Sequence, residues 1–512
     1  MALNPVKGLK RIEARRKIEI VNSGYSNHGA SKTKKSLLGW ISKGGSPKED
    51  IDDNLLTLRE RSRDLYMGAP LATGALKTMR TNIVGSGLKV KPTIDYKTLG
   101  MSEEDAAKWI ETTEKEFKLW SESKDCDAQR MNDFYELQQL AFLSWIMSGD
   151  CFVLLPFIER PMMPYDLRIW IIEADRVCNP DRPDDKIVSG VEVGNYGEVI
   201  AYHVCNQHPL AKSTGKKEWK RIEKYGKETG RPNVLHLMES ERPEQLRGIP
   251  ILAPVIEELK QLSRYTEAEL MAAVVSGMFT VFIESQDEDD GENMLGQMVD
   301  EDDSIDEIDD DYEIELGNGA IVQLNKGDKA NAINPGRPNT AFDGFVTSIT
   351  RQIGVALELP YEVLIKHFQS SYSASRGALL EAWKMFRMRR SWLANDFCQP
   401  IYEEWLAEAV ALGRIEANGF FSDPITRKAY CSAQWNGPSQ GQLDPKKEVD
   451  AAILRVNNGF STRSREAQEL TGTDFVQNAE LIARENELLK EAGIDYLAKG
   501  GENNEGEKDQ DE

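Results

Sequence analysis

The spacing of apolar residues predicts a chain built mainly from amphipathic helices, with short strands grouped in its first half. Residues 55–84 place leucine, methionine and isoleucine at three- and four-residue steps, as helices do, and Pro70 divides this pattern. A helix is expected over residues 102–121, capped by Ser102, and another over residues 132–147.

Runs rich in β-branched and aromatic residues follow, separated by glycine, asparagine and proline. They predict strands over residues 151–157, 167–172, 187–193, 199–204 and 233–238. Together with the helices before them, these strands indicate an α+β domain of about 200 residues.

Two further helices, over residues 251–275 and 340–357, enclose a segment of different character. Residues 278–283 and 320–324 are short apolar runs near glycine and asparagine, a pattern typical of strands and their turns. We therefore expect an antiparallel two-helix stalk with a small β-containing module at its tip.

The C-terminal third returns to helices. After a loop over residues 358–373, a long helix is expected over residues 375–396. Pro400 should kink or end it. Short helices are expected over residues 444–491. The long helix has a basic face, made by Arg376, Lys384, Arg387, Arg389 and Arg390.

Charge is concentrated in one window. The chain has a formal net charge of -22, and the window from Tyr265 to Asn325 holds nineteen acidic residues and no lysine or arginine. Such a concentration creates a local field and indicates a module with its own partner. The alternative is a disordered acidic loop over residues 286–311, because like charges repel and bury little apolar surface.

The first fifty residues have the opposite charge, with eleven lysines and arginines against four acids. We expect a mobile basic arm there. At 512 residues, the chain is too long for one core and should form about two to four domains. No apolar run approaches the roughly 18 to 20 residues of a membrane span, and the N-terminus lacks a signal-peptide core. These features predict a cytosolic protein with no membrane partner.

Candidate chemistry is sparse. The six cysteines show no short Cys-x-x-Cys spacing, which indicates reduced thiols. His203, Cys205 and His208 come nearest to a metal site, but on a strand only the first two share a face, so no metal is expected. Glu173 and Asp175 give only weak support for a nuclease site, because two acids on one strand face are usually solvated or salt-bridged. Without a complete P-loop, nucleophile elbow or His-Glu-x-x-His helix, neither catalysis nor a cofactor is expected.

A series of short phrases occurs in order along the chain. They are Arg61-Ser-Arg-Asp-Leu-Tyr66, Thr81-Asn-Ile-Val-Gly-Ser-Gly-Leu88, Leu137-Gln-Gln-Leu140, Ser148-Gly-Asp150, Ile172-Glu-Ala-Asp-Arg-Val177, Gly190-Val-Glu192, Ala201-Tyr-His203, Pro243-Glu-Gln-Leu-Arg-Gly-Ile-Pro250, Pro360-Tyr361, Ser371-Tyr-Ser-Ala-Ser-Arg376, Asp444-Pro-Lys446 and Gly459-Phe-Ser-Thr462. In this order the chain resembles lambda-type bacteriophage portal proteins, the head-tail connector family, over about residues 55–491. The acidic insertion and the basic arm depart from the family pattern.

The resemblance implies a ring, typically a dodecamer, at one capsid vertex, through which double-stranded DNA is packaged and later ejected. It implies a portal-type protomer with an α+β wing (55–250, completed by 376–440), a two-helix stem (251–275 and 339–357), a small β-containing clip (276–338, with the acidic insertion at 286–315), a tunnel loop (358–375) and a helical crown (441–499). Residues 1–54 and 500–512 would be the basic arm and a disordered acidic tail.

The resemblance also implies partners. The clip would bind the large terminase subunit and then head-completion or tail connector proteins, next to the major capsid and scaffolding proteins, first in the host cytoplasm and then in the virion. Its docking residues would be Asp300, Glu301, Asp302, Asp303, Asp309, Asp310 and Asp311. The tunnel loop would meet DNA without sequence specificity through Lys366, His367, Gln369, Ser370 and Ser371.

Two other functions stay open from the sequence. One is a capsid-associated scaffold or interaction protein without a DNA channel. The other is a nucleic-acid-processing enzyme.

Overall fold

The computed structural model describes residues 30–31, 34–40, 42, 44–212, 215–277, 281–284, 329–332, 341–368, 371–441, 444–473 and 475–492. The chain divides into two compact units, Met1–Asn54 and Leu55–Glu512. The described part of the first unit forms short helical turns: η2 (Lys35–Leu37), α2 (Pro47–Asp50) and η3 (Asp52–Asn54). Most of the predicted basic arm, residues 1–29, lies outside the described residues.

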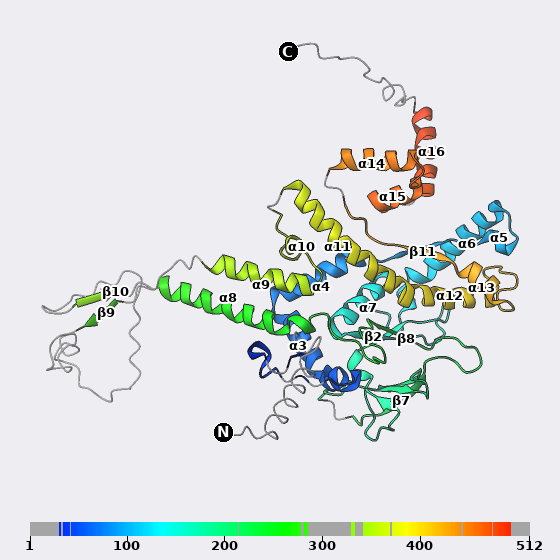
Figure 1. Ribbon diagram of the computed structural model, residues 1–512. Coiled ribbons are helices and arrows are strands. Elements are labelled where there is room, and N and C mark those ends of the chain that lie inside the picture. Colours follow the sequence, from blue (N-terminus) through cyan, green and yellow to red (C-terminus); the bar gives the residue numbers. More distant parts are fainter. Residues whose placement is uncertain are drawn as a thin grey trace, which may run out of the picture. The chain divides into compact units, whose positions relative to one another are not determined.

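The second unit opens with the helix pair that the apolar spacing predicts (Figure 1). α3 (Leu55–Gly68) and α4 (Pro70–Ile83) are separated at Ala69, and Pro70 begins α4, where the missing N–H costs least. Leu76 and Met79 are fully buried, and α4 packs against α3 and against α7 (Phe134–Ser148).

Local capping sets the next helix boundaries. After the short α5 (Tyr96–Leu99), α6 (Glu103–Ser121) follows Ser102 as predicted, and the Ser102 hydroxyl accepts a hydrogen bond from the Asp105 N–H. α7 begins two residues later than predicted, because Asp133 and Glu136 form a capping box there. The short η4 (Lys124–Cys126) lies between them.

Aromatic rings fill the core between α6, α7 and α12 (Gln399–Ala411). The Phe117 ring centroid lies 4.9 Å from that of Trp405 and 5.6 Å from that of Phe134, both in edge-to-face arrangements. Such pairs add to the hydrophobic stabilisation of the core.

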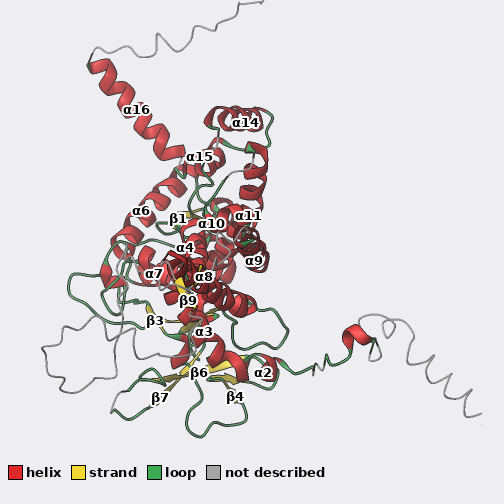
Figure 2. Ribbon diagram, turned by 90° about the vertical axis from the view of Figure 1, so that its left-hand side faces the viewer, coloured by secondary structure: helices red, strands yellow, loops and turns green. Residues whose placement is uncertain are grey.

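The strands form small antiparallel sheets (Figure 2). A three-stranded sheet has the order β3-β2-β8, and a four-stranded sheet has the order β4-β5-β6-β7. Between them lies a second core that includes Phe152, Tyr202 and Val234. The bounds are β2 (Asp150–Leu154), β3 (Trp170–Ile172), β4 (Ile187–Val188), β5 (Val191–Val193), β6 (Val199–Cys205), β7 (Trp219–Glu223) and β8 (Val234–Met238), with η5 (Ala174–Arg176) after β3.

One predicted strand was wrong. Residues 187–193 form the hairpin β4–β5, because Ser189 and Gly190 have φ values of 49° and 82° and turn the chain. The apolar pattern also missed β7 and the pair β1 (Lys89–Pro92) and β11 (Ala433–Asn436), which brings distant parts of the sequence together.

The predicted stalk is a pair of helices that lie side by side: α8 (Ile256–Gly277) and α9 (Phe342–Ala356) (Figure 1). The Tyr265 ring stacks on Phe342, with centroids 5.5 Å apart. α8 starts later than predicted, after the 3-10 turn η6 (Ala253–Val255), which has Pro254 in its first turn.

Between these helices, β9 (Val281–Glu284) pairs antiparallel with β10 (Lys329–Ala332). β9 overlaps the predicted strand over residues 278–283. The other predicted strand, over residues 320–324, lies outside the described residues.

The long basic helix is α11 (Tyr372–Leu393), and it does not end at Pro400. The chain passes through a π-helical turn, η7 (Ala394–Cys398), directly into α12. Pro400 lacks the N–H that a further helical bond would need, and the wider turn before it accommodates this loss. α13 (Pro424–Cys431) follows.

The last three helices that the structure describes are α14 (Pro445–Asn457), α15 (Arg463–Thr471) and α16 (Phe475–Glu491), in agreement with the predicted short helices. Arg455 of α14 holds Glu466 of α15 through two bonds of 2.9 and 2.6 Å. Among the helices that the structure describes, none combines the length and the apolar character of a membrane span.

Candidate functional site

The segment expected to meet DNA is shorter than predicted. Residues 361–365 form the helix α10 (Tyr361–Ile365), whose Val363 and Leu364 are buried in the main core. Because α11 already begins at Tyr372, only residues 366–371 separate the two helices. The loop expected over residues 358–373 was therefore wrong at its N-terminal end, where two apolar side chains anchor a helical turn.

Lys366 lies at the start of this turn. It ends α10 in the left-handed conformation, with φ of 56°, and the next N–H, that of His367, donates to the Glu362 carbonyl at 3.1 Å. Lys366 and His367 are exposed, and so is Ser371, directly before α11. The other two predicted contacts, Gln369 and Ser370, lie outside the described residues.

The basic face predicted for α11 is only partly exposed. Arg390 turns inward and donates to the carbonyls of Ile83 (3.0 Å) and Asn82 (2.8 Å) at the end of α4. Burial lowers the pKa of Arg390 to about 10. The last carbonyls of a helix have no partner within it, so this arginine acts as a cap for α4.

Arg389 is also buried and donates to Glu358 at 3.0 Å. Lys384 and Arg387 remain exposed. Lys384 pairs with Glu381 at 2.6 Å. The positive charge left on the surface of α11 is therefore smaller than the sequence predicts.

The α8–α9 pair exposes apolar side chains on both helices. Leu270 is 66% exposed on α8 and Val355 is 81% exposed on α9, whereas Ile353 on α9 is fully buried. Met271, Val274 and Phe345 are also exposed. Large apolar side chains exposed along both helices of a pair are typical of a surface that a partner covers.

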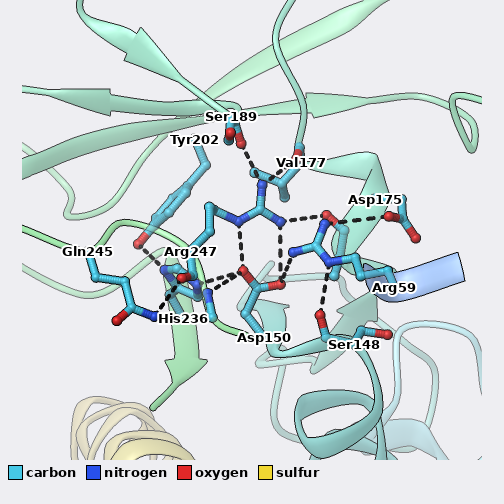
Figure 3. A network of polar contacts seen from close by, with 12 residues as sticks. Arg59, Ser148, Asp150, Asp175, Val177, Ser189, Tyr202, His236, Gln245 and Arg247 are labelled. Atoms are coloured by element: carbon cyan, nitrogen blue, oxygen red, sulfur yellow. Dashed lines mark hydrogen bonds and ion pairs between the residues drawn. The ribbon is translucent and has the colours of Figure 1, made fainter. Parts of the chain in front are cut away.

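Sequence reasoning missed a buried network of charges around the start of β2 (Figure 3). Asp150 is fully buried and accepts hydrogen bonds from Arg59 Nη2 (2.8 Å) and Arg247 Nε (2.6 Å). Arg247 also donates to the carbonyls of Ala174 (2.9 Å) and Val177 (2.8 Å). Burial opposes ionisation of Asp150, but Arg247 and Arg59 outweigh it and hold the pKa of this carboxyl below its ordinary value.

Two glycines let the chain segments meet at this network. A Cβ on Gly149 would lie 2.3 Å from the carbonyl oxygen of Gly248, and one on Gly248 would lie 1.9 Å from that of Gly149. The phrases Ser148-Gly-Asp150 and Pro243-Glu-Gln-Leu-Arg-Gly-Ile-Pro250 thus come together in space. Their positions in the sequence do not reveal that the two phrases contribute to one ion-pair network.

A group of metal-type ligands lies beside the network. Glu173, Asp175 and His208 bring ligand atoms within 4.8 Å of one another. Asp175 also pairs with Arg63 and lies 3.4 Å from Arg59. Because these arginines already neutralise the carboxylate, the group is an ion-pair network, as expected for the two acids.

Among the described residues, His208 is grouped with Glu173 and Asp175 and not with His203 and Cys205. His203 Nε2 lies 3.1 Å from the Glu192 carboxylate, which also accepts from Arg221 at 2.7 Å. Cys205 is buried. The predicted docking residues, from Asp300 to Asp311, lie outside the described residues.

Comparison with known proteins gives consistent matches over most of the chain. The family model described as phage portal protein, lambda family, matches residues 33–390. Portal protein B of Escherichia phage lambda is 25% identical over 469 residues, which cover 88% of this chain and 87% of that protein. The portal protein of Escherichia phage N15 is 25% identical over 482 residues, covering 90% and 89%.

Among solved structures, a chain from the neck of a native gene transfer agent particle aligns with a TM-score of 0.40 and 13% identity, over 81% of this chain and 92% of that one. The family model alone spans well over half of the sequence, and it includes α3 to α10 and most of α11. The chain therefore belongs to the lambda family of phage portal proteins.

Proposed function

We propose that copies of this chain form a closed ring at one capsid vertex, and that the ring is the channel through which double-stranded DNA is packaged and ejected. Family membership over residues 33–390 is the observation that carries the proposal. The exposed apolar side chains of α8 and α9 support it, because a folded subunit that exposes them needs neighbours.

Within this ring we assign the parts of the chain by function. α8 and α9 are the stem that lines the channel, and the segment between them is the clip, with the acidic insertion over residues 286–315. The α+β domain with α12 and α13 is the wing, residues 366–371 are the DNA-facing part of the tunnel loop, and α14 to α16 are the crown.

The clip would bind the large terminase subunit during packaging and head-completion proteins afterwards. The ATP would be hydrolysed by that separate motor, so the ring itself would have a structural role, in the host cytoplasm during assembly and then in the virion. A channel with an acidic excess would let DNA slide, because tight binding of many phosphates would hold the duplex.

Negative-stain images of the purified full-length protein test this function. We expect closed rings with a central hole, and no ATPase or nuclease activity in the same preparation. A well-folded monomer at working concentration would contradict the proposal. Assemblies without a hole would favour a scaffold, and an activity that co-purifies with the ring would favour an enzyme.

A further inference from the structure

A groove of about 790 Å³ lies between two sheet edges in the α+β domain. β7 is an edge strand of the four-stranded sheet, and β3 is an edge strand of the three-stranded sheet. The groove is lined by Trp170 of β3 and Trp219 of β7, together with the apolar side chains of Leu154, Val204 and Ile222. It thus combines an apolar lining with an open strand edge.

The outer edge of β7 has unused backbone groups. The Lys224 N–H donates to the Ile200 carbonyl on β6 at 2.8 Å, and the register pairs Ile222 with Tyr202. Hydrogen-bonding groups alternate sides along an antiparallel strand, so those of Trp219 and Arg221 point away from β6. Within the described part of the chain, these N–H and C=O groups form no hydrogen bond.

Trp170 lines the groove with its ring, whereas its indole nitrogen is buried. The indole N–H of Trp170 is enclosed and has no hydrogen-bond partner among the described residues. The Arg176 guanidinium lies 5.6 Å from the centre of the same indole ring. The groove therefore presents the apolar face of an indole ring beside a cation.

The groove is lined by three basic residues, Arg176, Lys220 and Arg221, and by two acidic ones, Glu218 and Glu223, and Arg221 is paired with Glu192 and Glu223. The chain segment around it carries a larger positive excess. Residues 211–231 contain eight lysines and arginines and three glutamates, although the whole chain is strongly acidic. Lys220 lines the groove and is exposed. An occupant with acidic side chains would be attracted to this surface.

We propose that this groove docks an extended acidic segment of another protein, which adds as a strand to the outer edge of β7. Its backbone would pair with Trp219 and Arg221, and alternate side chains would be bulky and apolar to fill the space beside Trp170. Strand addition of this kind takes its affinity from main-chain bonds and its specificity from side-chain pockets. Unlike the ring and the channel, it concerns a docking surface on the wing.

The test uses the assembled full-length protein and a fluorescein-labelled peptide that alternates glutamate with leucine, with binding measured by fluorescence anisotropy. Arg221→Pro removes the outward N–H of β7, at an edge position where proline is tolerated. Arg221→Ala is the matched control, because it loses the same side chain and its bond to Glu192 but keeps the N–H. We expect Arg221→Pro to weaken binding about tenfold and Arg221→Ala to change it less than about twofold.

A second variant keeps the test decisive if Arg221→Pro disturbs the sheet. Lys220→Glu should weaken binding of the same peptide, more strongly at low salt than at high salt. A peptide that alternates lysine with leucine should bind less well. Equal effects of Arg221→Pro and Arg221→Ala, equal binding of the two peptides, or displacement of the peptide by a short DNA duplex would overturn the proposal.

Discussion

At the scale of single residues, the stability of the α+β domain depends on a few buried charges. Asp150 is held by two arginines, and His236 lies beside it, with its Nε2 3.5 Å from Asp150 Oδ2. A buried ion pair adds little stability over apolar packing, but removing one partner leaves the other charge without compensation. These residues are buried, and we therefore expect them to tolerate substitution poorly.

Replacement of Asp150 by asparagine should lower the free energy of unfolding by about 3–5 kcal/mol, because Arg59 and Arg247 would lose their buried counter-charge. Urea denaturation at fixed protein concentration measures this. Glu111→Gln is a control, since it breaks an exposed pair with Lys115 and should cost no more than about 1 kcal/mol. Equal losses of unfolding free energy in the two variants would show that the buried network stabilises the protein no more than an exposed ion pair does.

The same network predicts a dependence on pH in two steps. Burial lowers the pKa of His236, although Asp150 acts in the opposite direction. The unfolded chain then binds the proton more readily, so stability should fall as pH drops below about 6.5, the ordinary histidine value. The contribution of Asp150, whose pKa is also lowered, should persist until pH falls below about 4. His236→Gln should remove the first step in a denaturation series, and an unchanged first step would assign it to other groups.

At the scale of elements, helices were the most predictable part of the chain and close contacts between distant segments the least. The periodicity over residues 55–84 and the proline inside it were sufficient for α3 and α4, because both signals are local. The inward turn of Arg389 and Arg390 was not predictable, since it depends on the end of α4 about 300 residues earlier in the sequence. For the candidate DNA contacts, the sequence correctly indicated that Lys366 and His367 are exposed. It did not predict α10, because that helix depends on the burial of Val363 and Leu364 in the core.

The turn between α10 and α11 allows a test of DNA contact. Lys366→Glu should impair DNA packaging or retention while rings stay intact, because a carboxylate would repel phosphates where an ammonium attracts them. The left-handed backbone conformation of this residue is about equally unfavourable for glutamate and for lysine. Packaging assays with Lys366→Arg as the control measure the effect of charge, and normal packaging by Lys366→Glu would leave the turn an ordinary exposed one.

The helices proposed as the stem, α8 and α9, allow a test of assembly. Leu270 is largely exposed on α8, so Leu270→Glu should prevent ring formation and leave a folded monomer, as judged by sedimentation and circular dichroism. Leu259, on the same helix, is buried, and Leu259→Ala should instead cost about 2–5 kcal/mol of subunit stability. Rings formed by Leu270→Glu at the same protein concentration would show that the interface lies elsewhere.

At the scale of the whole molecule, the main feature is uneven charge. The window from Tyr265 to Asn325 holds nineteen acids, against a net charge of -22 for the entire chain, so the remainder is nearly neutral. In the proposed ring, this window is repeated once per subunit and its charges repel one another. Cations or a basic partner would offset that repulsion.

Neutralisation of this charge should slow the docking of the motor or head-completion protein. We expect a chain with Asn or Gln at Asp300, Glu301, Asp302, Asp303, Asp309, Asp310 and Asp311 to form normal rings but to associate with its partner more slowly, and with a weaker dependence on salt. Stopped-flow association at several ionic strengths measures both effects. If the association rate and its dependence on salt are both unchanged, the acidic residues have no role in docking.

The uninterrupted helical path from Tyr372 through η7 to Ala411 has a mechanical consequence. One end adjoins the turn that bears Lys366, and α12 at the other end packs Trp405 among the aromatic rings of the main core. Helices are stiff along their axes. If the turn contacts moving DNA as proposed, a load applied there would travel along this path into the main core. The helical path would deform first at the π-helical turn η7, because the hydrogen bonds there already depart from the α-helical pattern.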